Sequence, residues 1–248
     1  MRSFNNLIMN EWLKLSKKHT FIVPYLILIL LSLLLGYIIH SGSPDMFKSA
    51  YDFSAMMLLS QGIGQVITIL AIIGTAGIVS KEYSQGTIKF LLIRARSRTA
   101  ILASKYVVVL VYGLTLTLVA TIAVFGTGVI WFGLTGGEAG WSDIFMNLLY
   151  NLVSTIVYGT LALMLGILTT STGVTIGVTM FALMMDKLII SRDFYKYVLF
   201  PNLNLAAYEG GGAPMPGMTL NFSMIMLILY TAVFLLIGFS VFRRRDVA

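Results

Sequence analysis

The sequence contains no cysteine, and only 11% of its 248 residues are charged, with ten acidic residues against seventeen basic ones. Without cysteine there is no disulfide framework, no thiol nucleophile and no cysteine-based metal site. A soluble domain usually carries about 25% charged residues. Because 58% of the residues are apolar, these few charges could not cover the surface of a soluble fold. The composition therefore predicts an integral membrane protein.

Sequence patterns for nucleotide binding and catalysis are also missing. There is no GxxxxGK[ST] phosphate loop, so ATP is not bound in that manner. The only histidines, His19 and His40, flank one apolar run and would lie roughly 30 Å apart at 1.5 Å per residue, too far to share a metal. No apolar run carries the His, Glu and Ser set of an intramembrane hydrolase. We expect no catalytic site, metal site or bound cofactor in this chain.

Long uncharged runs supply the predicted membrane-spanning helices, each of which needs about 20 mainly apolar residues. They predict an all-α integral membrane protein with a single transmembrane domain over residues 1–248 and six transmembrane helices. The spans are expected at about residues 21–39, 56–79, 106–132, 144–168, 174–190 and 221–242. The polar stretch 169–173 separates the fourth span from the fifth.

Two further segments are predicted to lie along the membrane surface. Residues 3–18 form an amphipathic pattern with Phe4, Leu7, Ile8 and Leu15 on one face, which indicates an interfacial elbow helix. Residues 191–220 mix aromatic side chains with a triple-glycine run. Short re-entrant or interfacial helices are expected there, before the sixth span.

The basic residues indicate how the spans are oriented. Positively charged loops resist transfer across the bilayer, so they mark the cytoplasmic side. Thirteen of the seventeen basic residues fall on one side of the predicted map, which places both termini in the cytoplasm and requires an even number of spans. These thirteen are Arg2, Lys14, Lys17, Lys18, Lys81, Lys89, Arg94, Arg96, Arg98, Lys105, Arg243, Arg244 and Arg245. The charge thus follows topology, and no nucleic acid partner is expected.

Four amides within the spans are candidates for a translocation path. Gln61 and Gln65 share one face of the second span, and Asn147 and Asn151 share one face of the fourth, each pair at i, i+4. Amides inside a membrane need partners and face protein or a water-filled path. Hydrogen bonding between neighbouring helices explains them equally well.

The loop 81–98 is the most basic connection in the chain and has Glu82 as its single acid. Ile88, Leu91 and Leu92 lie between its basic residues at helical spacing, which predicts a cytoplasmic docking helix. Gly86 can end one helical turn and Thr87 can begin the next. The alternative is that Gly86 is an ordinary helix C-cap and takes no part in the docking of a partner protein.

Several of these stretches resemble the ABC-2 type transporter permeases, in particular the bacitracin and lantibiotic immunity and peptide-toxin exporter branch. The resemblance rests on residues 10–15 (NEWLKL), 81–89 (KEYSQGTIK), 201–204 (PNLN) and 242–246 (FRRRD). It implies a half-transporter in a bacterial cell membrane, paired with a second permease subunit and surrounded by membrane lipids. It also implies two copies of a separate ATP-binding cassette ATPase, which would bind ATP and Mg. Ala95 departs from the proline that many relatives carry after the coupling helix.

The resemblance also implies a site and a function. The ATPase-coupling residues would be Lys81, Glu82, Tyr83, Gly86, Thr87 and Lys89. The complex would export amphipathic peptides or lipophilic antibiotics and toxins, and this chain would not be an enzyme. A non-transporting membrane scaffold or sensor that recruits a cytoplasmic partner is the alternative. A third possibility, an intramembrane enzyme, would require the amides Gln61, Gln65, Asn147 and Asn151 to surround one water-filled pocket.

Overall fold

The computed structural model describes residues 4–17, 19–85, 97–185 and 192–245, and every regular element in these ranges is helical. The longer helices are α1 (Phe4–Ser16), α2 (His19–Gly42), α4 (Ile63–Ser84), α6 (Arg98–Phe132), α7 (Trp141–Thr169), α8 (Thr172–Met185) and α10 (Leu220–Arg244). The shorter ones are η1 (Pro44–Met46), α3 (Ala50–Met57), η2 (Asp193–Tyr197), α9 (Leu199–Leu203) and η3 (Leu205–Gly211).

Five helices in the described part of the chain, α2, α4, α6, α7 and α10, are long and apolar enough to cross a membrane. The prediction of an all-helical, multi-pass membrane protein is confirmed at this level. The six predicted spans are not all found in the described residues, because α8 has 14 residues and is too short to span a membrane. Residues 186–190 of the expected span 174–190 lie outside the described residues.

The second predicted span differs most from the structure. Where the sequence predicted one helix over residues 56–79, α3 ends at Met57 and α4 begins at Ile63. The interruption is stabilised from another helix. Asn147 and Asn151 of α7 donate hydrogen bonds from Nδ2 to the carbonyls of Ala55 and Leu58, at 3.2 and 2.7 Å. Carbonyls at the end of α3, which would otherwise lack partners, are thereby satisfied.

The other helices follow the predicted spans with shifted ends. α6 begins at Arg98, eight residues before the expected start at residue 106, because Ser97 caps it by accepting a hydrogen bond from the amide of Ala100 at 3.2 Å. Its first two turns therefore carry Lys105 on helical backbone. The break expected at 169–173 is narrow, since α7 ends at Thr169 and α8 begins at Thr172 around Thr170 in the left-handed conformation (φ 53°).

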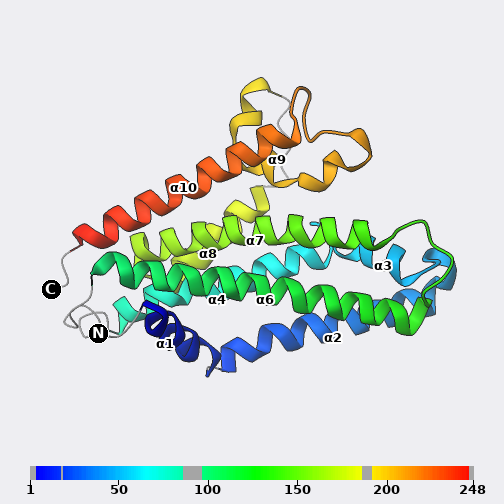
Figure 1. Ribbon diagram of the computed structural model, residues 1–248, viewed down its shortest axis with the longest axis horizontal. Helices are drawn as coiled ribbons and strands as arrows, with labels where there is room; N and C mark the ends of the chain where they lie inside the picture. The colour runs from blue at the N-terminus through cyan, green and yellow to red at the C-terminus, as the bar shows by residue number, and fades with distance from the viewer. Residues whose placement is uncertain (1–3, 18, 86–96, 186–191, 246–248) are drawn as a thin grey trace.

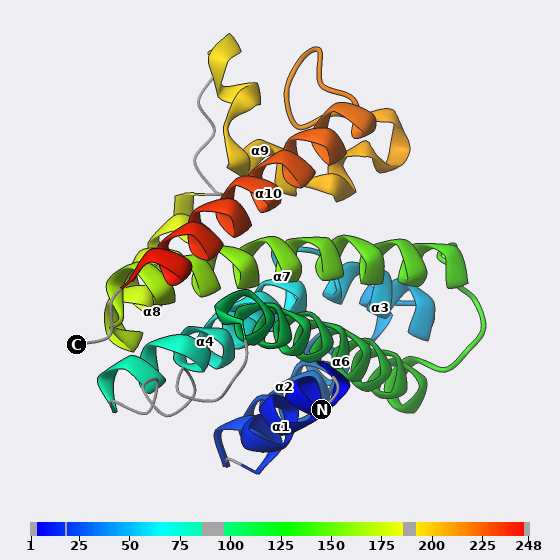
Figure 2. The same ribbon diagram turned by 60° about the vertical axis from the view of Figure 1, so that its left-hand side comes forward.

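α4, α6 and α7 form the centre of the bundle, and α2 and α10 flank it on opposite sides (Figures 1 and 2). α2 packs mainly on α6, and α10 packs mainly on α7. Most of the apolar stretch of α2 and α10 remains exposed, as expected for helices that face lipid. Tyr112 and Tyr158 are the largest fully buried side chains, and the ring of Tyr112 packs where Gly74 of α4 has no side chain.

Both described ends of the chain and the two helix ends around residues 86–96 lie at one end of the bundle (Figure 1). Polar contacts fasten this end. Arg98 of α6 donates to the carbonyls of Arg243 and Arg245, at 3.0 and 2.7 Å, and Arg245 in turn donates to the carbonyl of Ile167 near the end of α7. The last turns of α7 and α10 are thus held against the start of α6.

Candidate functional site

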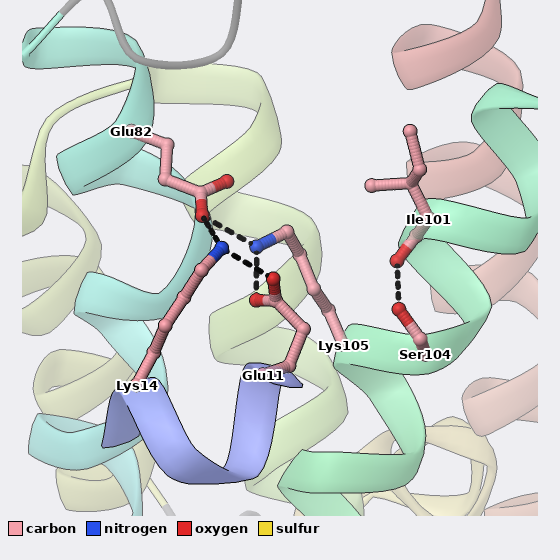
Figure 3. Close-up of polar contacts among 6 residues, drawn as sticks. All are labelled: Glu11, Lys14, Glu82, Ile101, Ser104 and Lys105. Carbon is pink, nitrogen blue, oxygen red and sulfur yellow. Dashed lines mark hydrogen bonds and ion pairs between the residues drawn. The ribbon is translucent and has the colours of Figure 1, made fainter. Parts of the chain in front are cut away.

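Four charged side chains from three helices meet at this end of the bundle (Figure 3). Lys105 of α6 places Nζ 2.6 Å from Oε2 of Glu11 and 2.8 Å from Oε1 of Glu82. Lys14 places its own Nζ 2.5 Å from Oε1 of Glu11 and 3.5 Å from Oε1 of Glu82. Each lysine therefore contacts both carboxylates, and we call these four residues the charge cluster.

The helices bring the charge cluster together in a simple way. Glu11 and Lys14 lie one turn apart on α1, Glu82 lies in the last turn of α4, and Lys105 lies two turns into α6. The side chain of Lys105 is fully buried (0% exposed). A buried ammonium without a counterion would lower the free energy of unfolding by about 3–5 kcal/mol. The two carboxylates therefore allow Lys105 to be buried here. The charge cluster is electrically neutral and connects α1, α4 and α6.

The electrostatics of the two groups on α1 agree with this geometry. Burial alone would raise the pKa of Glu11, but the charge of Lys105 and its hydrogen bond, together with Lys14, lower that pKa below its ordinary value. Burial opposes the charge of Lys14 as well, yet Glu11 and Glu82 raise the pKa of this ammonium. Both residues are therefore held in their charged forms at neutral pH.

A groove runs beside the charge cluster, along one face of α4. Its volume is about 190 Å³ and it lies between α1, α6 and α8. Its polar end includes Lys81, Glu82 and Gln85, and its apolar end includes Ile73 and Gly74. We call it the α4 groove.

A separate polar cavity lies next to the interruption between α3 and α4. It has a volume of about 310 Å³, and its walls include Gln61, Gln65 and Asn151. Gly64 is required for the close packing here, because a Cβ at this position would overlap the amide oxygen of Asn151. Ser60, Thr68, Ser154 and Asn204 add further polar groups to the lining. We call it the break cavity.

Three of the four predicted path amides thus line the break cavity. Asn147 is 3% exposed and instead lines a small adjoining cavity, together with Asn151, and a wider cavity beside α3. Its hydrogen bond to α3, like that of Asn151, is the interhelical contact that the sequence left open as an alternative. Gln61 and Gln65 remain candidates for a path.

The predicted coupling residues are only partly within the described chain. Lys81, Glu82 and Tyr83 lie in the last turn of α4. The ring of Tyr83 packs under the guanidinium of Arg245, 5.3 Å from its centroid. The predicted residues Gly86, Thr87 and Lys89, and the docking helix expected around them, fall outside the described residues.

The sequence patterns do not predict the charge cluster. They indicate a coupling role for Glu82, and they place Glu11 and Lys14 in the elbow helix and Lys105 among the cytoplasmic basic residues. One signal was present: once α6 is known to begin at Arg98, Lys105 is a lone cation inside an apolar helix and needs an acidic partner. The sequence does not show which acid, because Glu11 is 94 residues away.

The helices and this site together define a multi-pass α-helical membrane protein. Comparison with known proteins then gives the family: a model described as "Protein of unknown function (DUF2705)" matches residues 20–248, and the chain belongs to this family. Over 202 residues it is 37% identical to the "Uncharacterized protein YhcI" of Bacillus subtilis (strain 168), covering 73% of this chain and 64% of the relative. The chain thus spans less than two thirds of that relative.

A second relative is the "Uncharacterized membrane protein YdbK" of the same organism. It is 27% identical over 207 residues, which cover 79% of this chain and 84% of the relative. The description of this relative as a membrane protein agrees with the membrane assignment. The prediction that the chain is an ABC-2 type permease is wrong, because the matching family is this one and its relatives are uncharacterised. The short motifs that suggested it, such as residues 81–89, are compatible with many basic loops between membrane helices.

Proposed function

We propose that this chain is the membrane-spanning subunit of a transport complex that is driven by a separate cytoplasmic ATPase. The observation that carries the proposal is the neutral charge cluster around the buried Lys105, which connects α1 and α6 to the last turn of α4. Glu82 is near the end of α4 and Lys105 is near the start of α6, the two helices that residues 86–96 join in sequence. A partner that binds at these helix ends would act on all three helices at once.

α4 links the charge cluster to the break cavity. Gln65 and Glu82 lie 17 residues apart on one continuous helix, which corresponds to about 26 Å at 1.5 Å per residue. Rigid helices transmit displacements as discrete rearrangements of packed elements. A shift of the cytoplasmic end of α4 would therefore reach the break cavity, where Gln61 and Gln65 would contact the cargo.

The proposed topology follows from the same reasoning. The charge cluster, both termini and residues 86–96 would face the cytoplasm of a bacterial cell. α1 would lie at the membrane surface as an elbow helix, and α8 with the residues after it would complete a sixth span. The short helices η2, α9 and η3 would lie at the outer surface, near the break cavity.

The proposed complex contains two copies of this or a related membrane subunit and two copies of the ATPase, which would hold ATP and Mg. This chain would bind no cofactor and would not be an enzyme itself. Amphipathic peptides or lipophilic antibiotics are the proposed cargo, because the break cavity combines amides and hydroxyls with leucine side chains. Cargo of this class could enter from the membrane.

The test begins with the composition of the complex after gentle solubilisation from native membranes. We expect an ATPase in equal number to this chain, and ATP-dependent transport of an amphipathic peptide by the complex in liposomes. Glu82→Gln is expected to lower transport at least about tenfold while the complex stays assembled, because Lys105 keeps Glu11 as its partner. The matched control is Glu209→Gln, the same substitution at an exposed residue of η3.

Two results would contradict the proposal. Purification without any ATPase, together with no nucleotide-dependent change in α4, would favour a scaffold or sensor. Unchanged transport by assembled Glu82→Gln complexes would remove the charge cluster from the mechanism.

A further inference from the structure

Lys81 lies at the polar end of the α4 groove. It lies three residues before the end of α4 at Ser84, and its side chain folds back over Gly77. A Cβ built on Gly77 would lie 3.0 Å from Cε of Lys81 and 3.4 Å from its Nζ. Helix side chains lean toward the N-terminal end of their helix, so the stem of Lys81 covers Gly77 and its ammonium lies beside the α4 groove.

Nothing in the described part of the chain neutralises this ammonium by an ion pair. The carboxylates of Glu11 and Glu82 already have Lys14 and Lys105 as counterions. Lys81 therefore adds one positive charge that the charge cluster does not balance. Because Lys81 is only partly exposed, an anion bound from outside the chain would stabilise its charge.

The α4 groove leads from this cation into the apolar part of the bundle. Gly74 and Gly77 form its floor, while Ile176 of α8 and Val108 of α6 belong to its walls. Ile73 lines the groove and is 46% exposed, so the groove borders the lipid-facing surface of α4. Its shape and chemistry are those of a site for an amphiphile, with a charged end and an apolar end.

We propose that the α4 groove binds one anionic phospholipid, with the headgroup phosphate beside Lys81 and an acyl chain along Gly74 and Gly77. The amide of Gln85, at the same polar end, is a further donor for the headgroup. A zwitterionic headgroup is less suitable because its cationic part would need a carboxylate, and both carboxylates of the groove are paired with lysines. This inference does not depend on the proposed transport function.

The test uses the full chain, purified and delipidated in detergent micelles, and native mass spectrometry with added phosphatidylglycerol. We expect one retained equivalent on the wild-type chain. Lys81→Gln is expected to weaken this binding about fivefold, the effect of losing one lysine next to an anionic headgroup. Lys17→Gln, the same substitution at an exposed residue that follows α1 and lies outside the groove, should leave the binding unchanged.

A second variant tests the apolar end of the groove. Gly77→Leu fills the floor and is expected to abolish the retained equivalent, whereas Gly177→Leu, in open space on α8, is expected to have no effect. Thermal unfolding of each variant shows whether it is folded.

The proposal is overturned if phosphatidylcholine binds as tightly as phosphatidylglycerol, or if Lys81→Gln and Lys17→Gln bind equally well. It is also overturned if glycerol phosphate alone binds as tightly as the lipid, since the site would then recognise a free anion. Unaltered binding by folded Gly77→Leu would place the lipid elsewhere on the chain.

Discussion

Lys105 illustrates how one side chain can determine the arrangement of three helices. Its ammonium is fully buried and contacts the carboxylates of Glu11 and Glu82. Its burial is possible only when α1 and α4 both present their acids to it. The docking of α1 is therefore an electrostatic as well as an apolar contact.

Replacing Lys105 by methionine should destabilise the protein. Lys105→Met would leave two carboxylates near Lys14 alone, and we expect a loss of about 3–5 kcal/mol in the free energy of unfolding. The double variant Lys105→Met/Glu11→Gln keeps the site neutral and should recover most of this loss. Unfolding in detergent, monitored by circular dichroism, measures both. Equal stability of the single variant and the wild type would contradict the prediction.

The docking of α1 should also depend on pH. Because the pKa of Glu11 is lower in the folded protein than its ordinary value of 4.5, its stabilising effect is fully present above that value and is lost as the pH falls through the lower, folded pKa. Hydrogen exchange of α1 amides should therefore accelerate on acidification. Glu11→Gln should remove this part of the pH dependence. Identical pH profiles for the two proteins would exclude the contribution of Glu11.

The paired helices α3 and α4 show what hydropathy alone cannot predict. The run 53–80 carries no charge, so its hydropathy does not distinguish a broken helix from one ordinary span. The break forms because Asn151, on a distant helix, satisfies the carbonyl of Leu58, and because Gly64 allows α7 to approach. The long helices were predictable from local composition, whereas the break cavity and the charge cluster depend on tertiary contacts.

Enlarging Gly64 should therefore disturb the break. Gly64→Ala places a methyl group onto the Asn151 amide oxygen and the carbonyls of Leu58 and Leu59, and we expect a cost of about 1–3 kcal/mol from overpacking. Gly177→Ala, with open space around it, should be neutral or slightly stabilising because alanine favours helix. Thermal unfolding midpoints of the two variants provide the comparison. A higher midpoint for Gly64→Ala than for the wild type would show that the break tolerates a side chain.

At the scale of the whole molecule, the distribution of charge was predictable but the orientation remains a prediction. The contacts of Arg98 with Arg243 and Arg245 bring two basic segments, the start of α6 and the end of α10, to one end of the bundle. The orientation of this end in the membrane is set when the chain is inserted into the bilayer, and the packing of the helices does not show it. The absence of cysteine makes a direct measurement possible, because any introduced cysteine is the only thiol.

We expect a membrane-impermeant maleimide to label Ser142→Cys, at the start of α7, in intact cells. Lys17→Cys, directly after α1, should be labelled only after the cells are opened. Both positions are exposed. Labelling of Lys17→Cys in intact cells would reverse the proposed orientation.

The contacts made by the end of α10 bear on the order in which the chain assembles. Arg245 donates to the end of α7, and Arg98 donates to carbonyls at residues 243 and 245. α6 and α7 are synthesised long before these partners, so their adjoining ends must wait for α10 to leave the ribosome. During synthesis, this end of the bundle is therefore the last to close, and a newly made chain would pass through a stage in which the central helices are inserted but still open.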